Sequence, residues 1–69
     1  NILKLSGIGG LNLTYVFATD TTLVIDCRDY ESAYVLDDAQ IRLWQAINRM
    51  GLSIRNIKIE KGGQVFCDF

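Results

Sequence analysis

Three acidic residues stand close together in the first half of the chain: Asp26, Asp29 and Glu31. Carboxylate oxygens bind calcium and other hard cations, and paired carboxylates can act as general acid and base. Calcium takes about six to eight oxygen ligands, however, and the spacing here does not match the loop of an EF-hand. We therefore interpret these residues as a solvated acidic turn, and we expect no metal ion and no other cofactor.

The residues needed for nucleophilic catalysis are missing from the sequence. The chain contains no histidine, and neither Cys27 nor Cys67 has a recognisable base beside it. We also expect no structural zinc site, because zinc needs a full set of Cys or His ligands and the two cysteines lie far apart in a chain without histidine. We expect two buried free thiols, as is common in a reducing, cytoplasmic compartment, with a single disulfide as the alternative. The sequence therefore favours a protein that is not an enzyme.

Positive charge gathers in the second half of the chain, although the net charge is −1. The residues concerned are Arg42, Arg49, Arg55, Lys58 and Lys61. Together they could line a groove for the phosphates of a nucleic acid, with Trp44 or Phe66 available for stacking. Structural roles also explain part of the set, because Asp38 lies four residues before Arg42 and Arg49 suits a helix C-terminus. Nucleic-acid binding is thus the alternative function, not the leading one.

The clearest secondary-structure signal is one amphipathic helix at about residues 38–50. Asp37 and Gln40 have the spacing of a capping box, and Leu36 and Ile41 have that of a hydrophobic staple. Gly51 can end the helix in the left-handed conformation. The residues on the predicted apolar stripe are Ala39, Leu43, Ala46, Ile47 and Met50, with Trp44 at its edge.

Runs of β-branched and aromatic residues predict strands on both sides of this helix. Before it, residues 11–17, 22–27 and 33–36 form an antiparallel meander, with Phe17 opposite Leu23 and Ile25 opposite Tyr34. After it, residues 54–60 and 64–69 flank a glycine-containing loop and predict a hairpin. In these registers both cysteines face inward. Residues 1–10 are interpreted as a short strand followed by a glycine-rich connection.

The 69 residues make one domain of the α+β class, since a chain of this length cannot support a second core. In the predicted meander Val16, Val24 and Val35 point away from the helix, and one helix cannot cover both faces of a sheet. Either the C-terminal hairpin folds over this surface, which would give a small sandwich or barrel, or another chain covers it. The sequence therefore leaves an apolar surface without an assigned neighbour.

The leading functional hypothesis is a non-catalytic protein–protein interaction module. It would be a homodimer, or an accessory or inhibitory subunit of a larger protein. A metal-dependent enzyme that uses the three acids is the third alternative. No apolar run is long enough to span a membrane, and Asn at position 1 suggests a trimmed or excised chain. The candidate interface residues are Val16, Val24, Val35, Phe66, Asp26, Asp29 and Glu31.

Overall fold

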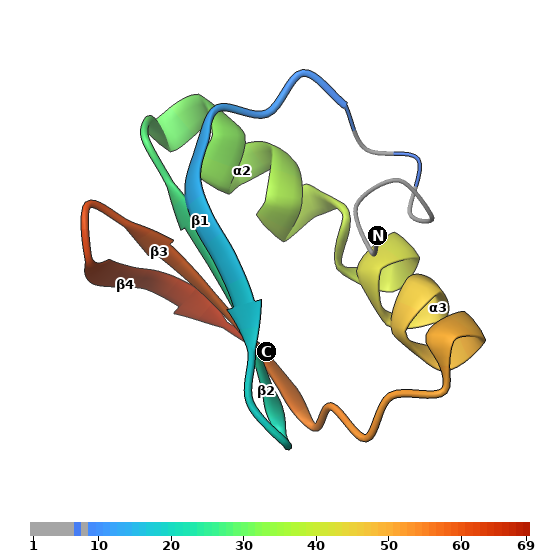
Figure 1. Ribbon diagram of the computed structural model, residues 1–69. Coiled ribbons are helices and arrows are strands. Elements are labelled where there is room, and N and C mark those ends of the chain that lie inside the picture. The colour runs from blue at the N-terminus through green and yellow to red at the C-terminus, as the bar shows by residue number, and fades with distance from the viewer. Residues whose placement is uncertain (1–6, 8) are drawn as a thin grey trace.

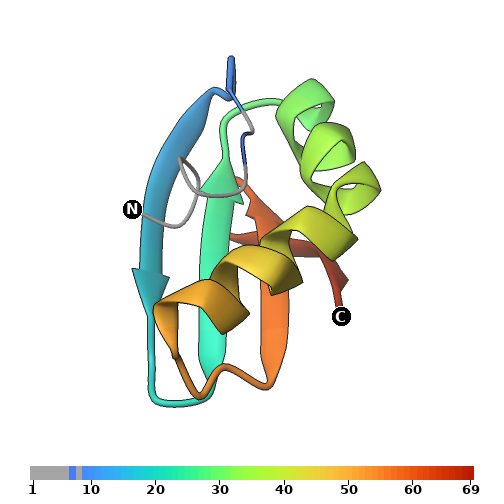
Figure 2. The ribbon, with the colours of Figure 1, turned by 90° about the vertical axis from the view of Figure 1, so that its right-hand side faces the viewer.

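A computed structural model describes residues 7 and 9–69 (Figure 1). In this part of the chain, four strands form one sheet in the order β1-β2-β3-β4, and two helices lie over one face of it (Figure 2). The predicted α+β class is therefore confirmed. The elements are β1 (Leu13–Ala18), β2 (Thr22–Cys27), α2 (Tyr30–Asp38), α3 (Gln40–Met50), β3 (Asn56–Lys61) and β4 (Gln64–Asp68).

The sheet is mixed, because β1 and β2 are antiparallel, β2 and β3 are parallel, and β3 and β4 are antiparallel. A parallel pair needs a crossover connection, and the two helices supply it. The predicted three-stranded meander is wrong, since residues 33–36 belong to α2 and not to a strand. The C-terminal hairpin extends the same sheet and does not fold over it as a second layer.

Helix α2 begins where the side chain of Asp29 accepts a hydrogen bond of 2.8 Å from the backbone N–H of Ser32. This is N-cap chemistry, and Glu31 in the first turn suits the positive end of the helix dipole. Ser32, Ala33 and Leu36 are buried at helical spacing. Capping and burial on one face therefore outweigh the strand propensity of residues 33–36.

The predicted helix start at Asp37 is wrong, because Asp37 lies in the last turn of α2. Gln40 does pair with it, since its Nε2 donates to Asp37 Oδ1 at 2.8 Å, but this bond links two helices and caps neither. Between them, Ala39 departs from helical geometry with φ −103° and ψ 22°. The predicted staple is also wrong, because Leu36 is buried and Ile41 is 75% exposed.

The end of α3 agrees with the sequence prediction. Gly51 takes the left-handed conformation with φ 68° and ends the helix after Met50. The predicted stripe is buried except for Met50, which is exposed. The core between helices and sheet is built from Leu23, Ile25, Cys27, Ala33, Leu36, Leu43, Ala46, Ile47, Ile57 and Ile59.

The hairpin of β1 and β2 is present, but its predicted register is wrong by one residue. Phe17 lies opposite Val24, where Leu23 was expected. The turn is one residue shorter than predicted, and Thr19 Oγ1 accepts a hydrogen bond of 3.0 Å from the N–H of Thr22. A shift of one residue moves every side chain of a strand to the other face. Tyr15 and Phe17 therefore lie on the face that the helices leave open.

The hairpin of β3 and β4 is also present, with a turn one residue shorter than predicted. Lys61 pairs with Gln64, so that Gly62 and Gly63 alone form the turn, with φ of 62° and 85°. Positive φ at both central residues is the conformation that favours two glycines in such a turn. The prediction of a C-terminal hairpin is thus confirmed with a tighter loop.

A bulge in β4 turns Phe66 towards the helices. Ile59 lies opposite Cys67 whereas the next residue, Glu60, lies opposite Val65, so Phe66 is the extra residue. Its ring contacts Tyr34 edge-on, with centroids 5.0 Å apart. Phe66 therefore lies on the helix side of the sheet, packed against the core.

Both cysteines have free thiols, and both pack in or against the core, Cys27 fully buried and Cys67 partly buried. The inward orientation predicted for them is confirmed. In the described part of the chain, neither helix combines the length and the apolar character needed to cross a membrane.

Candidate interaction edge

Strand β1 forms one edge of the sheet (Figure 2). Within the described residues its only strand neighbour is β2, and all of its residues except the first are exposed. Its sequence, LTYVFA, carries no charge. An edge strand presents unpaired backbone N–H and C=O groups, and charged side chains usually guard it against further pairing. The side chains of β1 include no charge that would hinder pairing with a further strand.

The hydrogen bonds of the β1–β2 turn show which backbone groups point outwards. The N–H of Thr19 donates to the carbonyl of Thr22 at 2.8 Å. Hydrogen-bonded and non-hydrogen-bonded pairs alternate along an antiparallel pair of strands, so Phe17 bonds to β2 while Val16 and Ala18 do not. The N–H and C=O groups of Val16 and Ala18 therefore point to the outer edge.

Aromatic side chains stand beside this edge on the open face of the sheet. Tyr15 is 40% exposed and Phe17 is 49% exposed, and their ring centroids are 5.6 Å apart. The hydroxyl of Tyr15 donates a hydrogen bond of 2.7 Å to Glu60 Oε1. This bond, with the nearby charge of Asp26, raises the pKa of Tyr15 to about 12. The phenol is thus held in place and protonated next to Phe17.

The opposite edge of the sheet, formed by β4, is guarded. Mutual backbone bonds of 2.6 and 2.9 Å join Ile57 and Phe69, so the backbone groups of Asp68 point outwards. Asp68 carries a charge at that edge, and the bulge at Phe66 interrupts the strand. Charges and bulges are the usual devices that keep an edge from pairing. The two edges of this sheet therefore differ in their readiness to accept another strand.

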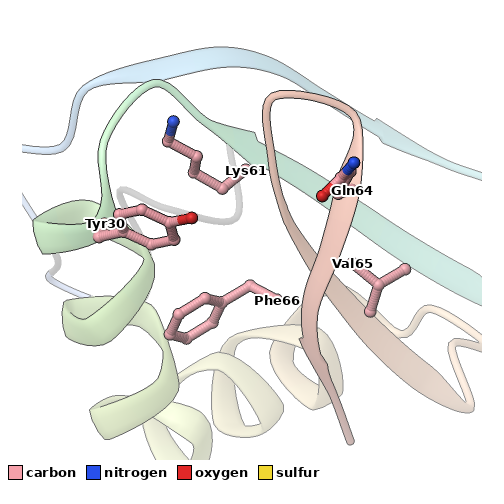
Figure 3. Close-up of a pocket in the computed structure, with 5 residues that line it drawn as sticks. All are labelled: Tyr30, Lys61, Gln64, Val65 and Phe66. Atoms are coloured by element: carbon pink, nitrogen blue, oxygen red, sulfur yellow. The ribbon is translucent and has the colours of Figure 1, made fainter.

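A small hollow of about 180 Å³ lies between the start of α2 and the C-terminal hairpin (Figure 3). In Figure 3 the side chains of Tyr30, Lys61 and Phe66 border it, and that of Val65 points away. The ammonium of Lys61 lies 4.9 Å from the centre of the Tyr30 ring, a cation–π distance. With Gln64 as its remaining lining residue, the hollow is a shallow seam between two elements that pack together.

The three valines of the predicted interface do not share one surface. Val16 and Val24 project to opposite faces of the sheet, because Val16 lies opposite Ile25 in the observed register. Val24 is buried, and Val35 is exposed on α2. Val16 alone lies at the outer edge of β1, and Phe66 lies in the seam beside α2.

The three acidic residues have separate structural positions. Asp26 is 1% exposed, and its Oδ2 accepts a hydrogen bond of 2.8 Å from the N–H of Gly63. Asp29 caps α2, and the hydrogen bonds from Ser32 lower the pKa of its carboxyl. Glu31 is exposed in the first turn of α2. Among the residues that the structure describes, no three Asp, Glu, Cys or His side chains gather as a metal site would require.

The five basic residues are spread over the molecule. Arg42 and Arg49 lie on α3, on the helix side, whereas Lys58 lies between the buried Ile57 and Ile59 of β3 and so faces the open side. Of the other two, Arg55 directly precedes β3 and Lys61 is its last residue, so they lie about 20 Å apart at the rise of a strand. The described structure therefore does not bring these five side chains together in one groove.

Sequence reasoning missed Tyr15, Phe17 and Ala18 as parts of a site. The signal that was present is the uncharged stretch from Leu11 to Thr19, beside a C-terminal hairpin that carries charges on both strands. The sequence carried no signal for which strands pair. The edge position of β1 depends on that pairing, because it follows from the parallel pairing of β2 with β3.

Comparison with known proteins identifies no relative of this chain: no family model matches it, nor does any curated protein or solved structure.

Proposed function

We propose that this protein is a non-catalytic interaction module that binds an extended segment of a partner protein along the outer edge of β1. The observation that carries this proposal is the uncharged, exposed edge at which the backbone groups of Val16 and Ala18 point outwards. In strand addition, main-chain hydrogen bonds supply affinity, and alternating side chains supply specificity.

The side chains of β1 indicate which segment would fit. Val16 and Ala18 project to the helix side of the edge, and Tyr15 and Phe17 project to the open side. Both sides are uncharged, so a partner segment gains nothing from charged residues and would bury them at a cost. We therefore expect an extended partner segment rich in β-branched or aromatic residues.

The first experiment uses a capped peptide of alternating threonine and valine, as long as β1, added to isotope-labelled protein and followed by NMR. We expect concentration-dependent shifts of the Val16 and Ala18 amides that are larger than those anywhere on β4. The same peptide with a central proline, which lacks a backbone donor, should cause much smaller shifts.

A matched pair of proline variants locates the site on the protein. Ala18→Pro removes an outward N–H of β1, and Asp68→Pro removes an outward N–H of β4. Proline is tolerated at such outward positions of edge strands. We expect Ala18→Pro to abolish peptide binding with the fold retained, and Asp68→Pro to bind like the wild type. Equal binding by both variants would overturn the proposal.

A further inference from the structure

We infer that the segment bound at this edge is β1 of a second copy, so that two chains form a twofold dimer with one continuous sheet. This inference rests on the proposed function and names its partner. It follows from the distribution of charge along β1, from the position of the bulge in that strand, and from the aromatic side chains beside it.

The charge distribution suits pairing of the strand with itself. In a twofold interface each residue near the axis meets its own symmetry mate or a close neighbour, so a charge there would meet a like charge. No residue from Leu11 to Thr19 is charged. A twofold pairing of β4 about Asp68, where the backbone groups point outwards, would instead bring the carboxylates of the two copies close together. Pairing of β1 with β1 of a second copy therefore brings no like charges together.

The bulge fixes the register of the proposed pairing. It lies between Leu13 and Tyr15, which leaves residues 15–18 as the regular part of the strand. A twofold axis that passes through the pair of Phe17 residues places Val16 of each copy opposite Ala18 of the other. All the outward backbone groups of residues 15–18 are then paired. Two such pairs supply about four hydrogen bonds.

The same register covers the exposed aromatic residues. The two copies of Phe17 stand directly opposite each other in a non-hydrogen-bonded pair, where side chains approach most closely. Tyr15 packs beside Phe17 within each chain, so that four rings would form one cluster on the open face. In this register Asp20 lies opposite Thr14, and no two like charges are paired. Aromatic cross-strand pairs of this kind stabilise sheets.

The test places a positive or a negative charge at Phe17. Light scattering and sedimentation velocity then measure whether each variant forms dimers. Phe17 is about half exposed, so Phe17→Lys and Phe17→Glu should keep the fold, which circular dichroism checks. We expect the wild type to dimerise, each variant alone to remain a single chain, and an equal mixture of the two variants to form a heterodimer. Val65→Lys, at a 55% exposed position on β4, should dimerise like the wild type.

A wild type that stays a single chain at every concentration would overturn the inference, and so would a Phe17→Lys variant that dimerises as strongly as the wild type. The threonine–valine peptide separates this failure from that of the proposed function. If the wild type is a single chain and the peptide still shifts Val16 and Ala18, only the second copy is rejected as the partner. If the peptide has no effect either, both proposals fail.

Discussion

The hydroxyl of Tyr15 reaches across a whole strand to donate its hydrogen bond to Glu60, because Tyr15 lies on β1, Glu60 on β3, and β2 runs between them. Asp26 of β2 lies opposite Tyr15 and beside Glu60. The Tyr15 side chain therefore crosses over Asp26, which is buried although it lies on the open face. This contact ties the edge strand to the middle of the sheet and holds Tyr15 next to Phe17.

The first prediction concerns the ionisation of Tyr15. Its pKa should be about 12, mainly because Glu60 accepts its proton in a hydrogen bond, and Glu60→Gln should lower it towards 10. Since the folded pKa exceeds the unfolded one, the stabilisation is complete below about pH 10 and is lost as the pH rises towards 12. NMR titration of the tyrosine rings measures this. Glu31→Gln on α2 is the control, and a wild-type Tyr15 pKa near 10 would contradict the prediction.

The second prediction concerns the buried carboxylate of Asp26. Asp26→Ala removes the acceptor for the Gly63 N–H and should lower the free energy of unfolding by about 1–3 kcal/mol. Urea unfolding measures the change. Asp20→Ala, at an exposed residue of the β1–β2 turn, should change it by less than about 0.5 kcal/mol. Equal effects of the two substitutions would show that the bond to Gly63 does not stabilise the hairpin.

The third prediction compares two residues of α3. Leu43→Ala should cost about 2–5 kcal/mol of unfolding free energy, because Leu43 is fully buried in the core. Ile41→Ala, on the exposed side of the same helix, should change the free energy by less than about 0.5 kcal/mol. Chemical denaturation of both variants measures these values. A large loss for Ile41→Ala would support the hydrophobic staple that the structure lacks.

The fourth prediction concerns the thiols. Burial, with the nearby charge of Asp26, raises the pKa of Cys27 to about 11, and burial with the charge of Asp37 raises that of Cys67 to about 11. At neutral pH both should therefore react with iodoacetamide more slowly than a free thiol. Asp37→Asn should lower the pKa of Cys67 and leave that of Cys27 unchanged. Reaction of either thiol at the rate of free cysteine would contradict this account.

Local sequence signals predicted the C-terminal hairpin and the end of α3, because Gly51, Gly62 and Gly63 mark conformations that glycine favours. They failed at α2, where the residues 33–36 have strand propensity but are held in a helix by the Asp29 cap and by burial of Leu36. The helical spacing of Ala33 and Leu36, behind the N-cap residue Asp29, was the signal that could have revealed it.

The candidate site was harder to predict than the fold, because it depends on register and on strand order. A turn one residue shorter than predicted places Tyr15 and Phe17 on the open face, because a shift of one residue moves every side chain of the strand to the other face. The parallel pairing of β2 with β3 leaves β1 at the edge, and this pairing joins residues that are distant in the chain. Of the predicted valines, only Val16 belongs to the edge now proposed.

The most direct test of the central claim is amide hydrogen exchange at β1 in a dilute solution of single chains. We predict that Val16 and Ala18 exchange rapidly while Phe17, bonded to β2, is protected, and that Val16 and Ala18 gain protection when a partner strand binds. If Val16 and Ala18 are protected as strongly as Phe17 in the dilute single chain, the outer edge of β1 is already occupied and the account is wrong.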